Sequence, residues 1–158
     1  MMSNMFVLSE KSLKNLNGVH ADLVRVVKTA ITITLIDFTI GEGLRTLERQ
    51  KQLYKTGATH TLNGRHLTGH AVDLIALVDK KERWDWPLYY KIAEAMRLAA
   101  KQERVKIEWG GVWDKTMDQY DDVEKEALRY IQRCKIRGKK AFTDGPHFQL
   151  AWIDYPKK

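Results

Sequence analysis

Cysteine is nearly absent from this sequence, since Cys134 is the only one. A chain with one cysteine cannot form an intramolecular disulfide, which is typical of proteins that fold in a reducing cytoplasm. No nucleophile signature surrounds Cys134, so we interpret it as a buried or idle thiol.

Long apolar runs are also missing. The longest, from Ala30 to Ile40, is interrupted by Asp37 and is too short to span a bilayer. The N-terminus lacks the basic region, apolar core and small-residue cleavage site of a signal peptide. We therefore expect no stable membrane insertion, and a target outside the membrane would require another protein to provide the passage.

Acidic residues are outnumbered, with 20 Asp and Glu against 27 Lys and Arg, which gives a net charge of +7. This excess favours an acidic partner such as nucleic acid, an anionic membrane or an anionic wall polymer. The basic residues are scattered, however, and no zinc-finger or RNA-binding signature is present. Nucleic acid is therefore the weakest of the three interpretations, and we expect no nucleic-acid partner.

The length of 158 residues and the 44% hydrophobic content suit one domain over residues 1–158. Hydrophobic periodicity predicts helices over 11–16, 20–30, 46–55 and 86–102, a charged and partly helical segment over 118–137, and strands over 35–42, 71–77, 105–109 and 147–152. A polar loop is expected over 59–64, a charged turn over 79–85 and a break at Gly110 and Gly111. Helices mixed with short strands predict an α+β fold with a small, mainly antiparallel sheet.

The stretch from Gly64 to Asp73 carries the first chemical signal. His66 and Asp73 flank a turn that Gly69 allows to be tight, so their side chains can converge. Imidazole and carboxylate are ligands of catalytic Zn²⁺ sites, which usually take three protein ligands and a water. The alternative is a loop histidine and a strand-end aspartate that only cap backbone groups. Strand alternation should point His70 away from Asp73.

A second signal lies in the stretch from Asp144 to Phe148. His147 offers the third metal ligand, and Asp144, three residues earlier in a Gly-Pro turn, could serve as general base. The alternative is an ordinary turn before a strand. Glu108 is the competing carboxylate for the base, although a strand-end salt bridge is its more ordinary role.

Four stretches together resemble the zinc peptidase family of the D-alanyl-D-alanine carboxypeptidases, whose central pattern is S-x-H-x-x-G-x-A-x-D. Within it, the closest likeness is to phage endolysins of the L-alanyl-D-glutamate endopeptidase type. The stretches are residues 6–9 with 18–24, residues 42–50, the central motif, and residues 108–111 followed by 144–148. They span nearly the whole chain in the family's order. Gly64 departs from the pattern, because the broader family has serine there.

The resemblance implies a Hedgehog/DD-peptidase-like fold and a role for each candidate residue. By it, His66, Asp73 and His147 are the zinc ligands and Asp144 is the catalytic base. Arg45 matches the arginine that holds the substrate carbonyl and the developing oxyanion, a task that suits a permanently charged guanidinium. The alternative for Arg45 is a surface salt bridge beside a helix.

The resemblance also implies a lytic enzyme that cuts the L-alanyl-D-glutamate bond in the stem peptides of bacterial peptidoglycan. Such a monomer would wait in the host cytoplasm until a holin-type pore gives access to the wall in the periplasm. A D-Ala-D-Ala carboxypeptidase or dipeptidase with the same zinc site, or a non-catalytic wall-binding module, are the alternatives. The presence of Asp144 argues against the last alternative, because a binding module has no use for a base.

Overall fold

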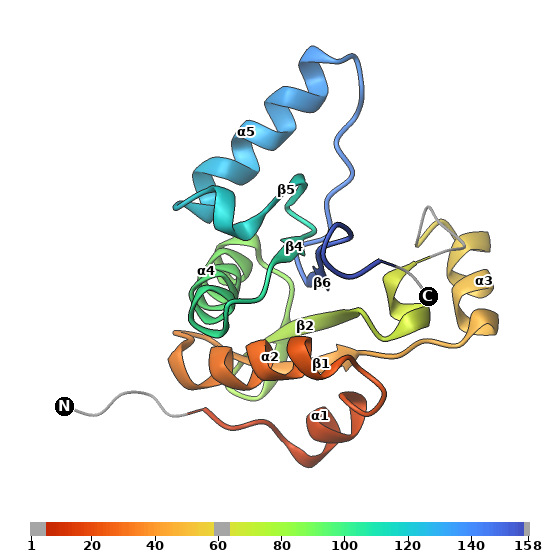
Figure 1. The fold of residues 1–158 in the computed structure, drawn as a ribbon, viewed down its shortest axis with the longest axis vertical. Coiled ribbons are helices and arrows are strands. Elements are labelled where there is room, and N and C mark those ends of the chain that lie inside the picture. Colours follow the sequence, from red (N-terminus) through yellow and green to blue (C-terminus); the bar gives the residue numbers. More distant parts are fainter. Residues whose placement is uncertain (1–5, 59–63, 157–158) are drawn as a thin grey trace.

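A computed structural model describes residues 6–58 and 64–156, and it has the predicted α+β architecture (Figure 1). Most of the loop expected over 59–64, including His60, lies outside the described residues. The helices are α1 (Glu10–Asn15), α2 (Ala21–Ile33), α3 (Leu47–Lys55), α4 (Trp86–Glu103) and α5 (Val123–Ile136), with short 3-10 helices η1 (Arg65–Thr68) and η2 (Met117–Gln119). The strands are β1 (Asp37–Glu42), β2 (Ala71–Val78), β3 (Lys81–Arg83), β4 (Ile107–Trp109), β5 (Val112–Thr116) and β6 (His147–Leu150).

One antiparallel sheet holds the strands in the order β1-β2-β6-β4-β5, and β3 pairs with the far end of β2. The register aligns three residues that are distant in the sequence. Asp73 on β2 pairs with Glu42 on one side and with His147 on the other. Because paired residues on adjacent strands lie about 5 Å apart, this row gathers charged and metal-binding groups at one place on the sheet.

Helices α2 and α4 pack against each other and complete the core with the sheet. Leu23, Val26, Val27 and Ala30 recur at helical spacing on α2, and all four are buried. Ser9 and Thr46 cap α1 and α3 by accepting hydrogen bonds from backbone N–H groups. The other main core side chains, fully buried, are Phe38, Leu74, Ile92, Met96, Ile107 and Phe148. None of the helices in the described part of the chain is long and apolar enough to cross a membrane.

Two short strands were not predicted from the sequence. The charged turn over 79–85 contains strand β3, whose residues are all exposed, so no alternation of apolar residues marked it. Strand β5 follows the Gly110–Gly111 break as the second arm of a hairpin, and only its first residue, Val112, is buried. Helix α5 lies within the segment that was expected to be charged and partly helical; Val123, Ala127 and Tyr130 form its buried side, and Ile131 is 43% exposed.

Helix α5 is fastened to β5 by the buried carboxylate of Glu126. It accepts hydrogen bonds or ion pairs from Arg133 at 2.7 Å, Lys115 at 3.1 Å and Arg129 at 3.4 Å. Burial alone would raise the pKa of Glu126, but the three cations lower it below its usual value. The ionised carboxylate therefore stabilises the fold above the pKa of an unfolded glutamate, and this contribution is lost as the pH falls through the lower folded pKa.

We expect Glu126→Gln to lower the free energy of unfolding by about 1–3 kcal/mol at pH 7, because it leaves cations partly buried without their charged partner. Urea unfolding at pH 7 and in acid measures the loss, which should shrink in acid. Glu124→Gln on the exposed side of the same helix is the control and should change the free energy by no more than about 0.5 kcal/mol. Equal losses in the two variants would contradict the role of Glu126.

Candidate active site

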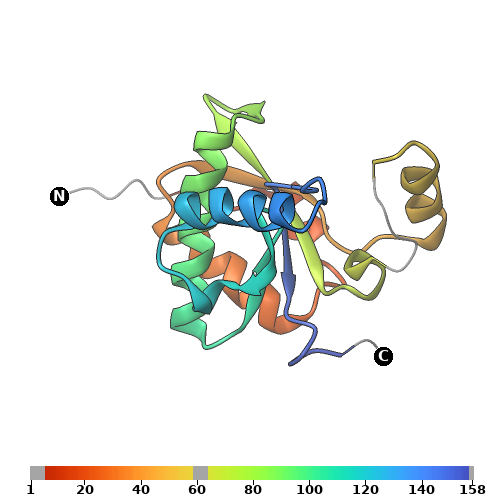
Figure 2. The same ribbon diagram turned by 90° about the horizontal axis from the view of Figure 1, so that it is seen from above.

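A cleft of about 620 Å³ lies between α3, η1 and the row of residues aligned across β1, β2 and β6. Helix α3 stands to one side of the sheet in both ribbon views (Figures 1 and 2). The residues that line the cleft include Glu42, Arg45, Gln50, Arg65, His66, Asp73, Glu108, Trp113, Phe142, Asp144, His147 and Trp152. All five site residues proposed from the sequence are among them.

His66, Asp73 and His147 converge inside this cleft, each from a different element. The Nε2 atom of His66 lies 3.2 Å from Oδ1 of Asp73, and Nδ1 of His147 lies 3.4 Å from the same oxygen. One ligand atom from each residue falls within 4.8 Å of the other two. Ligands at about 2.0–2.1 Å from a tetrahedral Zn²⁺ are about 3.4 Å apart, so two nitrogens and one oxygen at this spacing fit a metal ion.

The orientation of His66 is set by its backbone surroundings. Its Nδ1 lies 2.8 Å from the carbonyl oxygen of Gly43, which can only accept, so Nδ1 carries the proton and Nε2 faces Asp73. Gly69 ends η1 with a φ of +74°, and a Cβ there would lie 2.2 Å from the carbonyl oxygen of Gly18. The glycine between the two ligands is therefore required by both its conformation and its close packing.

His147 is oriented by a chain of side chains that the sequence analysis missed. Its Nε2 lies 2.7 Å from Oε1 of Gln149, and Nε2 of Gln149 donates to Oε1 of Glu108 at 2.8 Å. The amide oxygen accepts the ring proton, which leaves Nδ1 of His147 free to face Asp73. Alternation along a strand places residues 147 and 149 on one face, and this was the available signal. Glu108 thus contacts Gln149, where we had expected a strand-end salt bridge.

The electrostatics of the group depend on the carboxylate of Asp73. Burial would raise the pKa of Asp73, but His66 and His147 lower it well below its usual range. Burial alone would lower the pKa of His147, because it disfavours the charged imidazolium, but the hydrogen bond to Asp73 raises this pKa above its usual value. The ionised carboxylate attracts positive charge to this point, and a metal ion would compete with protons for the same nitrogens.

Asp144 belongs to the loop before β6, and that loop is held against the end of β4. Asp144 N donates to the carbonyl oxygen of Gly110 at 2.9 Å, and Gly110 N donates to that of His147 at 2.9 Å. A Cβ at Gly110 would lie 2.0 Å from the Asp144 carbonyl oxygen, so only glycine fits. Trp109 Nε1 donates to the Gly145 carbonyl oxygen at 2.8 Å. Gly110, where we predicted a break after the strand, therefore holds the loop that carries Asp144 in position.

The surroundings of Asp144 differ from those of Glu108. Burial and the charge of Asp73 raise the pKa of Asp144, while His147, His66 and Arg45 act in the opposite direction. Asp144 is thus within electrostatic reach of all three candidate ligands. Burial also raises the pKa of Glu108, but its charged neighbours are Arg65 and His147. Of the two carboxylates, Asp144 is the more closely associated with the three candidate metal ligands.

Arg45 is largely buried beside the same group. Its Nε and Nη2 donate to the two carboxylate oxygens of Glu42 at 2.9 Å each, and Nη1 donates to Oε1 of Gln50 at 2.8 Å. Nη2 also lies 3.8 Å from Oδ2 of Asp73. The guanidinium is therefore fixed at the edge of the cleft, and the alternative of a surface salt bridge beside a helix does not describe it.

His70 and two tryptophans near the motifs occupy different places. His70 lies with Nδ1 2.6 Å from Oγ1 of Thr68 and packs against His20, so it is outside the metal-binding group of the described residues. Trp109 is fully buried in the core. Trp113 lines the cleft, with its ring centroid 5.0 Å from that of His147.

Comparison with known proteins gives the family. The sequence model described as phage L-alanyl-D-glutamate peptidase matches residues 2–151. The chain belongs to this peptidase family. It is 27% identical over 124 residues to the L-alanyl-D-glutamate peptidase of Escherichia phage T5, a match that covers 76% of this chain and 90% of that protein. It is 31% identical over 83 residues to the L-alanyl-D-glutamate peptidase of Listeria phage A118, covering 52% of this chain and 28% of that protein.

A solved structure shares the fold of this peptidase. The crystal structure of the Serratia marcescens L-Ala D-Glu endopeptidase ChiX superposes with a TM-score of 0.74 and 38% sequence identity. The match covers 96% of this chain and 95% of that one. The α+β fold with a small antiparallel sheet, expected from the sequence, is confirmed.

Proposed function

We propose that this peptidase is a zinc-dependent endolysin that hydrolyses the L-alanyl-D-glutamate bond of peptidoglycan stem peptides. The observation that carries the proposal is the convergence of His66, Asp73 and His147, with Asp144 beside them, in a cleft of a chain from this family. Two neutral imidazoles and one carboxylate would leave a bound Zn²⁺ with a net charge of about +1. Such an ion, held by these three residues, would supply Lewis-acid polarisation of the scissile carbonyl.

The other residues have separate tasks in the proposed reaction. Asp144 takes a proton from the attacking water and passes it to the nitrogen of the leaving D-glutamate. Burial raises the pKa of Asp144 toward neutral pH, and a group with such a pKa can both accept and return a proton. Arg45, held by Glu42 and Gln50, stabilises the negative charge that develops on the carbonyl oxygen.

The wider setting of the reaction follows from the same proposal. The net charge of +7 suits attachment to an anionic wall. The enzyme acts as a monomer, with no nucleic-acid partner. It remains in the host cytoplasm until a holin-type pore admits it to the wall in the periplasm.

Mass spectrometry of fragments released from purified peptidoglycan tests the bond specificity. We expect new fragments with N-terminal D-glutamate, and none of these when the Asp144→Asn variant is added instead. Release of a terminal D-alanine would assign the same site to a D-Ala-D-Ala carboxypeptidase. An absence of new fragments from the metal-loaded wild-type protein would favour a non-catalytic wall-binding module.

A further inference from the structure

Helix α5 and the residues that follow it form a surface that the proposed reaction does not use. Both ribbon views place α5 along the outside of the molecule, and Figure 1 shows it at the end remote from α1. We define residues 128–140 as the α5 surface. None of its residues is among those that line the catalytic cleft. Its features therefore need an explanation other than catalysis.

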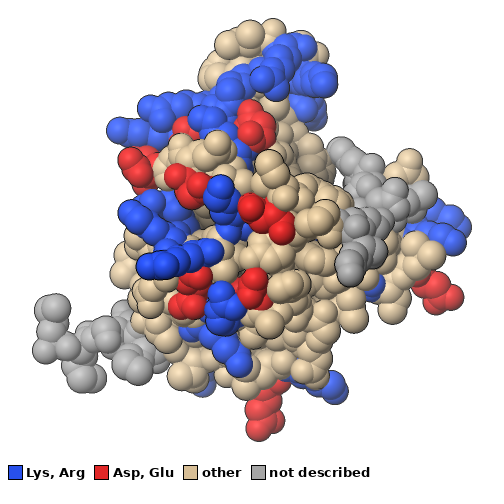
Figure 3. Space-filling model, in the orientation of Figure 1, with Lys and Arg blue, Asp and Glu red and all other residues tan. Residues whose placement is uncertain are grey.

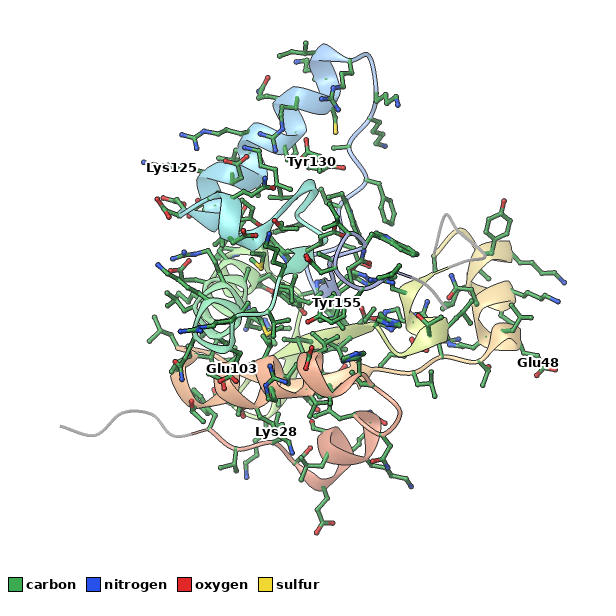
Figure 4. The ribbon with its side chains drawn as sticks, in the orientation of Figure 1. Lys28, Glu48, Glu103, Lys125, Tyr130 and Tyr155 are labelled. Carbon is green, nitrogen blue, oxygen red and sulfur yellow. The ribbon has the colours of Figure 1, made fainter. Side chains whose placement is uncertain are left out.

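The outward side of α5 exposes large apolar side chains. Leu128 is 54% exposed, Ile131 is 43% exposed and Ile136 is 84% exposed, and all three line one shallow apolar groove. The opposite side of the helix already packs on the body of the protein through Tyr130, which points toward β5, whereas Lys125 points outward (Figure 4). Leu128 and Ile136 are consequently outside the hydrophobic core, whereas Ile131 also lines a small pocket with Trp86 and Tyr90.

The same surface is strongly basic. Residues 128–140 contain six cations and no acidic residue: Arg129, Arg133, Lys135, Arg137, Lys139 and Lys140. Two of these, Arg129 and Arg133, pair with Glu126 or Asp114. The other four are exposed, and the ion pairs found within residues 6–58 and 64–156 include none of them. Figure 3 shows Lys and Arg side chains gathered over the end of the molecule where α5 lies.

We propose that the α5 surface binds the anionic face of a phospholipid bilayer, with the helix lying in the headgroup region. An interfacial helix combines an apolar side, which enters the acyl boundary, with Lys and Arg that contact anionic headgroups. The first feature is supplied by Leu128, Ile131 and Ile136, and the second by the four exposed cations from Lys135 to Lys140. This contact is peripheral and requires no membrane-spanning segment.

Two other occupants fit the surface less well. A second copy of the chain would bring two sets of like charges together, which opposes association. An anionic wall polymer would satisfy the cations, but branched aliphatic side chains have no apolar counterpart in a polar glycan. Because exposed isoleucines and exposed cations share this surface, a lipid bilayer fits it best.

Vesicle sedimentation with the full chain tests the proposal. Vesicles of 30% phosphatidylglycerol in phosphatidylcholine are compared with vesicles of pure phosphatidylcholine. We expect at least ~10-fold tighter binding to the anionic vesicles, because several cations each contribute near an anionic surface. Rising salt should weaken this binding, because it screens the attraction.

Paired variants separate the two features of the surface. Ile131→Gln with Ile136→Gln removes apolar groups, and Lys139→Gln with Lys140→Gln removes charge. Each pair should weaken binding to anionic vesicles by at least ~10-fold. The matched controls lie on and before α1: Val7→Gln, at a residue 76% exposed, and Lys11→Gln with Lys14→Gln. They should bind as the wild type does.

Three results would overturn the proposal. The first is equal binding of the wild-type protein to the two kinds of vesicle. The second is binding of both α5 double variants to anionic vesicles as tightly as the wild type. The third is α5 variants that lose binding to purified peptidoglycan while their vesicle binding stays intact. The last result would assign the surface to the wall polymer. All variants should retain the wild-type melting temperature and cleave a soluble stem peptide at the wild-type rate, since the altered side chains are exposed and outside the cleft. Vesicle binding requires no hydrolysis, so it is tested independently of the proposed reaction.

Discussion

Asp144→Asn should reduce the hydrolysis of a soluble stem peptide by at least about two orders of magnitude. General acid–base catalysis contributes roughly 10²–10⁴-fold, and asparagine cannot accept the proton of the attacking water. The substitution nearly preserves shape, and the backbone N–H and carbonyl of residue 144 keep their bonds to Gly110 and His147. Steady-state kinetics should therefore show the loss mainly in kcat, with a small change in KM.

Two measurements show whether this loss comes from the proton transfer itself. The metal content and the melting temperature of Asp144→Asn should stay near the wild-type values, because residue 144 is not one of the three converging ligands. Glu108→Gln is the matched carboxylate control and should retain most of its activity, since its amide oxygen can still accept the hydrogen bond from Gln149. An inactive Glu108→Gln beside an active Asp144→Asn would transfer the role of base to Glu108.

The features that could be predicted from the sequence are those specified within a short stretch of residues. Hydrophobic periodicity predicted helices over 11–16, 20–30 and 46–55, close to α1, α2 and α3 as observed. The candidate ligands could also be named, because glycine and aspartate at fixed spacing from His66 mark a tight turn that enters a strand. The fold class followed from the order of such elements, since each is specified by a pattern within some ten to twenty residues.

The features that could not be predicted depend on contacts between distant segments. The alignment of Glu42, Asp73 and His147 is a property of strand register, which no single strand specifies. The support of His147 by Gln149 and Glu108 requires β6 to lie beside β4. Strand β5 escaped detection because it has few buried residues and takes its place from its partner β4.

Removal of a ligand should have the largest effect on the enzyme. We expect the wild-type protein to bind about one Zn²⁺ per chain, and His66→Ala, Asp73→Ala and His147→Ala each to lose both the metal and the activity. Each substitution leaves two ligands where a catalytic site needs three, and Asp73→Ala also removes the only carboxylate among the three. Metal analysis after dialysis against a weak chelator measures the content, and zinc titration of the apo-protein measures the affinity.

The control for the ligand variants is His70→Ala, four residues after His66 in the same motif. Its ring contacts Thr68 and His20 instead of Asp73, so the variant should keep the metal and most of the activity. Gln149→Leu should give an intermediate result, with zinc affinity reduced by about 10–100-fold, because it removes the group that orients His147 while all three ligands remain. A wild-type protein whose metal content stays well below one per chain after zinc addition would refute the site. Loss of the metal in His70→Ala, with His66→Ala unaffected, would show that the ligand on this side is the other histidine.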